Sequence, residues 1–142
     1  MPPGDRAMIP AQPFRGTPSD QESRRPAEPR LLVRQSEARA GVLVVTAAGI
    51  VDDSTAWLLQ RALWQDLPAT TVVDLSDVPA LGIAGVRVLE GAAARARADQ
   101  RRIALVARSS SVIRMLHLFA LDARIPVHAQ LSDALGVTQP SK

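Results

Sequence analysis

The stretch between residues 70 and 89 most constrains what this chain can fold into. It opens with an apolar, partly β-branched run over residues 72–75, which is typical of a strand covered on both faces. After a short loop, Val86 and Leu89 recur at helical spacing. The sequence therefore predicts a buried strand, a tight loop and a helix that begins near Gly85.

The predicted start of this helix has free backbone N–H groups, which suit an anion or an acidic group of a partner. Between Leu81 and Val86 there is no Ser, Thr, Asp or Asn. The helix is therefore expected to begin without a good capping side chain and without a hydroxyl group that could be modified.

Alternating strands and helices on both sides of this stretch predict an α/β fold. The first two strands form a hairpin, and the later strands run parallel through right-handed crossovers, giving a mixed sheet of four to five strands with four to five helices. Three segments should meet at the carboxyl ends of the strands, where such sheets bind ligands and partners. These segments are loop 48–54, loop 75–85 and the serines after residue 107. The predicted strands are 31–36, 41–47, 70–76, 102–107 and 125–129. The predicted helices are 55–66, capped by Asp53 or Ser54; 85–99; and 131–137, capped by Ser132. A further helix is predicted after the cap Ser109–Ser111, and its core candidates are Val112, Ile113, Leu116 and Phe119.

Length and composition predict one folded domain, residues 31–138, with a disordered Pro- and Arg-rich tail at 1–30 and a short tail at 139–142. The 142-residue chain has no cysteine, which excludes disulfides and thiolate zinc sites. The longest apolar stretch, residues 41–51, is too short to cross a bilayer, so a cytoplasmic protein without a membrane partner is expected.

The high isoelectric point, about 10.9, does not indicate nucleic-acid binding. The arginines are scattered and interleaved with acidic residues, the net charge is only +3, and aromatic residues for base stacking make up 3% of the chain. The sequence favours a solvated, arginine-rich surface.

No group of residues predicts catalysis, a cofactor or a bound metal. His117 and His128 are too far apart for a local metal motif, and His117 fits a surface or half-buried structural histidine. Helix capping explains the pair Asp52–Asp53 at least as well as a carboxylate site does, because adjacent side chains point apart. Ser109–Ser111 have no neighbouring base that the sequence identifies, which favours N-capping over nucleophilic catalysis. An enzyme is the least favoured class.

The order and spacing of four segments resemble the STAS domain of bacterial anti-sigma factor antagonists. The segments are 49–52, 72–78, 85–89 and 116–122, and the resemblance extends over residues 31–137. It implies the STAS fold and a role in transcription regulation through protein–protein interaction.

In that family the loop before the second helix reads Asp-Ser-Ser-Gly or Asp-Ser-Thr-Gly, and the hydroxyl residue before the glycine is phosphorylated by a kinase that is itself the anti-sigma factor. The matching residues here are Gly82, Ile83, Ala84 and Gly85. Because alanine carries no oxygen, the resemblance implies an antagonist that binds a kinase-type ATPase anti-sigma factor and is not switched off by phosphorylation at Ala84.

The alternatives are a STAS scaffold or oligomerisation module, or a small-ligand-binding module, with no sigma-factor role. The partner-binding residues implied by the resemblance are Asp52, Asp77, Leu81, Gly82, Ile83, Ala84, Gly85 and Val86.

Two tryptophans and one alanine complete the set of candidate residues. Trp57 and Trp64 share a side of the first helix that differs from its inward stripe, Ala56, Leu59 and Leu63. They mark either a contact with a partner or second copy, or burial at the edge of the core. Ala120 stands where the family often has a helix-ending glycine; a left-handed backbone there would cost roughly 1 kcal/mol.

Overall fold

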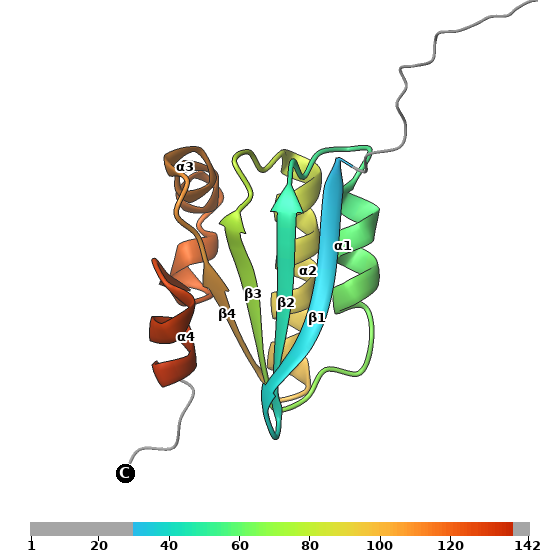
Figure 1. Cartoon of the computed structure of the whole chain (residues 1–142), viewed down its shortest axis with the longest axis vertical. Helices are drawn as coiled ribbons and strands as arrows, with labels where there is room; N and C mark the ends of the chain where they lie inside the picture. Colours follow the sequence, from blue (N-terminus) through green and yellow to red (C-terminus); the bar gives the residue numbers. More distant parts are fainter. Residues whose placement is uncertain (1–29, 138–142) are drawn as a thin grey trace, which may run out of the picture.

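Five strands form one sheet in the order β1-β2-β3-β4-β5 in the computed structural model, which describes residues 30–137 (Figure 1). β1 and β2 pair antiparallel, and each later neighbour pairs parallel, which confirms the predicted mixed sheet. The predicted tails lie outside the described residues, apart from Arg30. The elements are β1 (Leu31–Arg39), β2 (Val42–Gly49), α1 (Ala56–Leu63), β3 (Thr70–Asp77), α2 (Ile83–Ala98), β4 (Arg102–Val106), α3 (Ser110–Leu118), the 3-10 helix η2 (Leu121–Ala123), β5 (Val127–His128) and α4 (Leu131–Val137).

Helices cover both faces of the sheet, but unequally. On one face, α1, α2 and α3 pack on the main core, which contains Val73 of the central strand. On the other face, α4 places Ala134 against a smaller cluster that contains Val72. Adjacent side chains of β3 therefore enter opposite cores, and both are fully buried, as the apolar run of this strand predicts.

Gly49 fixes the geometry where the hairpin leaves the sheet. Its φ of +120° is a left-handed conformation that favours glycine, and a Cβ there would overlap the Arg30 carbonyl. The next residue, Ile50, donates its N–H to that carbonyl at 3.1 Å. The loop after β2 is thereby held at the carboxyl edge of the sheet.

Several predicted helix boundaries are wrong by a few residues. α2 begins at Ile83 rather than near Gly85, because Gly82 already accepts the first helical hydrogen bond, from Val86, at 3.1 Å. Ser132 lies inside α4 rather than capping it, because the N–H of Ala134 bonds to the carbonyl of Gln130 at 3.2 Å. The N-cap position of α1 is Thr55 rather than Asp53 or Ser54, without a side-chain capping hydrogen bond, and the helix ends at Leu63.

Helix faces follow the predicted stripes with one exception. In α1, Ala56, Leu59 and Leu63 are buried, as predicted. In α3, Val112 and Leu116 are buried, but Ile113 is 44% exposed and is not a core residue. It follows the buried Val112 directly, and neighbouring positions on a helix point about 100° apart.

The tryptophans of α1 are exposed, which excludes burial at the edge of the core. The exposed fraction is 54% for Trp57 and 60% for Trp64. The guanidinium of Arg95 lies 4.9 Å from the centre of the Trp64 ring, a cation–π contact between α2 and the end of α1.

Ala120 adopts the left-handed conformation that its alignment with glycine suggests. Its φ is +59° and its ψ is +24°, just after α3 ends. The chain then turns into η2 and reaches the short strand β5. In the part of the chain described, residues 30–137, no helix is both long enough and apolar enough to span a membrane.

Candidate partner-docking site

The β3–α2 loop lies beside the loop that follows β2. A parallel bridge joins Val51 to Leu81: the N–H of Val51 bonds to the carbonyl of Ala80 at 3.1 Å, and the carbonyl of Val51 accepts the N–H of Gly82 at 2.8 Å. The hydroxyl of Ser109, before α3, donates to the carbonyl of Pro79 at 3.0 Å. The three loops predicted to share the carboxyl edge of the sheet therefore meet there (Figure 1).

The first turn of α2 carries no capping side chain and no acidic residue. Gly82 occupies the N-cap position in an extended conformation, with φ of −88° and ψ of 179°. The N–H groups of Ile83, Ala84 and Gly85 precede the first helical hydrogen bond, so the helix supplies them with no acceptor. The N-terminal end of α2 carries the positive partial charge of the helix dipole, and no side chain of its first turn neutralises that charge.

Gly85 allows α2 to start this close to the sheet. It is buried, and a Cβ at this position would lie 2.5 Å from Cδ1 of Leu81 and 2.6 Å from Cγ1 of Val51. Gly82 is different: an added Cβ would make only an ordinary contact, 3.5 Å from the Val51 carbonyl oxygen. Helix packing therefore requires the second glycine of the loop, whereas space alone does not require the first.

Ala84 lies at the second position of α2, within its first turn. It is half-buried and packs on the main core, while the preceding Ile83 is 52% exposed. The structure thus places residue 84 beside an exposed apolar side chain at the uncapped helix end.

Asp52 organises the turn that faces this loop. Its carboxylate accepts the N–H of Ser54 at 2.9 Å, the hydroxyl of Ser54 at 2.7 Å and the Arg30 guanidinium at 2.7 Å. The hydrogen bond from the Ser54 hydroxyl is the main cause that lowers the pKa of Asp52 below its ordinary value, and the charge of Arg30 acts in the same direction. Asp52 therefore holds the loop in shape as a carboxylate while remaining partly exposed.

The other predicted contact residues divide into supporting and exposed positions. Three of these positions are buried between the loop and the main core: Leu81, Gly85 and Val86. Asp77 is exposed at the end of β3, where the register with β2 shifts. The solvent-accessible part of the predicted site therefore consists of Asp77 and Ile83, with Asp52, Gly82 and Ala84 half-buried.

Exposed apolar side chains occur in each segment around the loop. They are Ile50, 40% exposed, in the loop after β2; Trp57 in the first turn of α1; Ile83 at the start of α2; and Ile113 in the first turn of α3. We call these four residues the apolar rim. The sequence prediction missed Ile50 and assigned Ile113 to the core. The signal for Ile50 is its position directly after the last residue of β2.

Exposed apolar side chains gathered around one loop are a feature of surfaces that bind other proteins. A family model for the STAS domain matches residues 34–134, and the chain belongs to this family. It is 35% identical over 98 residues to the anti-sigma-F factor antagonist RsfB of Mycobacterium tuberculosis, a match that covers 67% of this chain and 80% of RsfB.

Solved structures agree with this assignment. An anti-sigma factor antagonist from Mycobacterium paratuberculosis superposes with a TM-score of 0.71 at 30% identity, covering 78% of this chain and 95% of that one. SpoIIAA in its unphosphorylated form superposes with a TM-score of 0.63 at 15% identity, covering 75% and 95% of the two chains. At that identity the second likeness concerns the fold alone.

Proposed function

We propose that this protein is an anti-sigma factor antagonist that binds its anti-sigma factor through the β3–α2 loop and the apolar rim. The observation that carries the proposal is the exposed Ile83 beside Ala84 at an uncapped helix end, in a chain similar to two proteins named as such antagonists. The role is one of binding without catalysis.

The partner surface should combine apolar contacts with an acidic group. Ile83 and Trp57 supply exposed apolar area, and buried aromatic anchors dominate many interfaces. The free N–H groups of the first turn of α2 suit a carboxylate from the partner. An anti-sigma factor with a kinase-type ATPase fold is the partner that the family pattern implies.

The alanine at position 84 gives this surface one charge state. A phosphoserine there would add about −1.5 to −2 charge at neutral pH and would disrupt an apolar contact by desolvation and repulsion. Because Ala84 has no oxygen to phosphorylate, we propose that binding is constitutive and that its extent depends on the amounts of the two proteins.

Binding to candidate ATPase-fold anti-sigma factors from the source cell, measured by calorimetry, tests this proposal. Replacing Ile83 by Glu places a charge at the centre of the proposed contact and should weaken binding by about tenfold or more. Leu118→Glu is the matched control, because Leu118 is 69% exposed at the other end of α3. Equal effects of the two substitutions, or no binding by the unmodified protein, would contradict the proposed site.

A homodimer formed through α1 is a second candidate, favoured by the exposure of both Trp57 and Trp64. Sedimentation at several concentrations would detect it. A dimer that dissociates in both Trp57→Ala and Trp64→Ala supports this scaffold function, and a monomer at all concentrations refutes it.

A further inference from the structure

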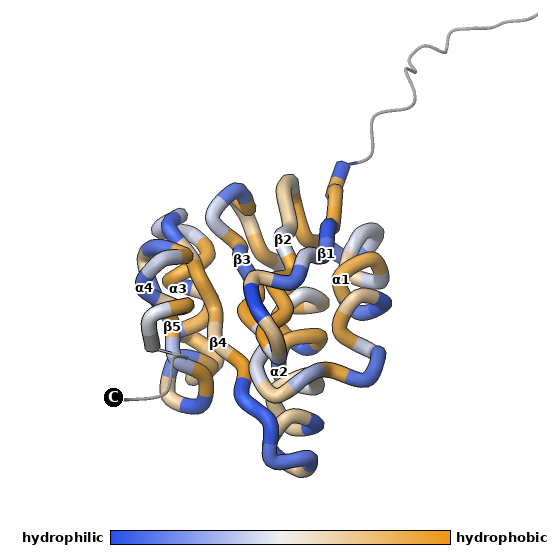
Figure 2. The backbone as a smooth tube through the Cα atoms, turned by 60° about the horizontal axis from the view of Figure 1, so that its bottom comes forward, coloured by the Kyte–Doolittle hydropathy of each residue, from blue (hydrophilic) through white to orange (hydrophobic). Residues whose placement is uncertain are grey.

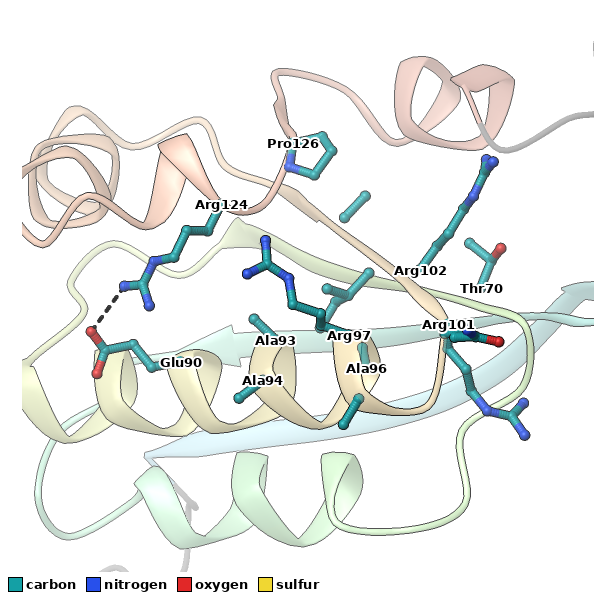
Figure 3. Close-up of a pocket in the computed structure, with 14 residues that line it drawn as sticks. Thr70, Glu90, Ala93, Ala94, Ala96, Arg97, Arg101, Arg102, Arg124 and Pro126 are labelled. Atoms are coloured by element: carbon teal, nitrogen blue, oxygen red, sulfur yellow. Dashed lines mark hydrogen bonds and ion pairs between the residues drawn. The ribbon is translucent and has the colours of Figure 1, made fainter.

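A basic groove lies at the end of the sheet opposite the β3–α2 loop. It runs between the second half of α2 and the start of β4, has a volume of about 750 Å³, and is bounded above by Pro126 (Figure 3). This size falls within the usual range of small-molecule sites, roughly 300–1,000 Å³. We call it the arginine groove.

Short elements and small side chains leave this space unfilled. The half of α2 that faces it presents alanines, including Ala93 and Ala96, where larger residues would close the gap. β5 pairs only with Leu105 and Val106 of β4, so within residues 30–137 no strand covers Ile103 on the side away from β3. The groove lies along this open edge of β4, and apolar residues such as Ala93, Ala96 and Ile103 form its floor.

Its charge is strongly unbalanced. Arg97, Arg101, Arg102 and Arg124 line the groove against one acidic residue, Glu90, which leaves a net of three positive charges. Glu90 is 3.2 Å from Arg124, and Figure 3 shows this pair at one end with Arg97 reaching from α2 toward Pro126. Figure 2 shows the hydrophilic turn that joins α2 to β4 at the other end.

Three of these guanidinium groups lack a protein partner. Within residues 30–137, the side chains of Arg97, Arg101 and Arg102 make no hydrogen bond or ion pair. Figure 3 shows these side chains pointing in different directions: Arg97 reaches toward Pro126, whereas Arg101 and Arg102 point away from each other at the far end. Arg97 is therefore the unpaired cation best placed to meet an anion in the groove.

We infer that the arginine groove binds an anionic amphiphile, a carboxylate or phosphate on a single alkyl chain. The guanidinium group of Arg97 would hold the anion by charge-assisted hydrogen bonds, and the alanine, Ile103 and Pro126 surface would cover the chain. Among residues 30–137, no aromatic side chain lines the groove, which disfavours a stacked nucleotide base.

An acidic peptide added as a strand is also disfavoured. Leu105 and Ala107 direct their N–H groups toward the β5 side, so the same alternation directs that of Ile103 there. The next N–H in this series, that of Arg101, is already bonded to the Ala96 carbonyl at 2.7 Å. One free residue is too short an edge for strand addition.

Calorimetric titration of the full chain with decyl phosphate and with decanoate, each below its micelle concentration, tests the inference. Both should bind, whereas decanol lacks the anion and inorganic phosphate lacks the chain, so each should bind at least about tenfold more weakly. Binding of inorganic phosphate as tight as that of decyl phosphate would overturn the inference. Preferential binding of ATP or of an acidic peptide would also overturn it. So would binding of phosphatidylglycerol vesicles without binding of the single-chain probes.

Substitutions then locate the site. Arg97→Gln removes an exposed, unpaired charge and should weaken decyl phosphate binding about tenfold or more, while Arg61→Gln on α1 should leave it within about twofold. Ala93→Leu should fill the groove and abolish binding, with circular dichroism to verify that the variant is folded. Binding that is unaffected by both Arg97→Gln and Ala93→Leu would place the ligand elsewhere and refute the inference.

Discussion

Replacing Gly85 by alanine should destabilise the protein, although alanine favours helices. A Cβ at this position would meet two side-chain carbons at 2.5 and 2.6 Å, from Leu81 and Val51, and both side chains are buried. Overpacking of this kind costs about 1–3 kcal/mol, and the helix propensity of alanine returns up to about 1 kcal/mol. We therefore expect a net loss of up to about 3 kcal/mol in the free energy of unfolding.

Gly91→Ala is the matched control, because it makes the same change in the same helix where an added Cβ meets nothing within 4 Å. It should raise the free energy of unfolding by about 0.5–1 kcal/mol. Urea denaturation followed by circular dichroism measures both variants. If Gly85→Ala proved as stable as Gly91→Ala, the close packing of α2 on the β3–α2 loop, and hence our account of the site, would be refuted.

Three further predictions concern single positions near the helix ends. Ala120→Gly should raise the melting temperature by several degrees, since it removes a strain of roughly 1 kcal/mol at a φ of +59°; an unchanged or lower value counts against that conformation. Gly82→Asp should stabilise the protein by a few tenths of a kcal/mol through capping of α2, because an added Cβ would make only an ordinary contact with the Val51 carbonyl oxygen. If the side chain clashed instead, urea denaturation would show a lower free energy of unfolding. The pKa of Asp52 is lowered in the folded state, so its contribution to stability is present above the ordinary value of 3.8 and is lost as the pH falls through the folded-state pKa. Asp52→Asn should remove this part of the acid dependence of the free energy of unfolding. Acid titrations in which the stability of the two proteins falls in parallel would argue against it.

The sequence predicted the sheet well because burial on both faces leaves a strong pattern. The apolar run of β3 and the inward stripe of α1 identify their own environments, and the order of elements then limits the topology. The absence of a side-chain cap on α2 was also predictable, since no residue between Leu81 and Val86 could provide one.

Boundaries and surface features were harder to predict, for physical reasons. The start of α2 at Ile83 depends on a backbone bond between Gly82 and Val51, two residues far apart in sequence, and apolar periodicity carries no trace of it. The exposure of Ile113 depends on how α3 is rotated against the sheet. The arginine groove depends on the shortness of β5, so scattered arginines that look like an ordinary solvated surface gather around one space.

The most direct test of our central proposal measures binding to the anti-sigma factor before and after incubation with that kinase and ATP, for the unmodified protein and for Ala84→Ser. We predict that the unmodified protein takes up no phosphate at the β3–α2 loop and keeps its affinity. The serine variant should be phosphorylated and lose its affinity about tenfold or more. Loss of affinity by the unmodified protein after incubation, with phosphate found on Ser76 or on Ser109–Ser111, would contradict the claim that this surface has a single charge state.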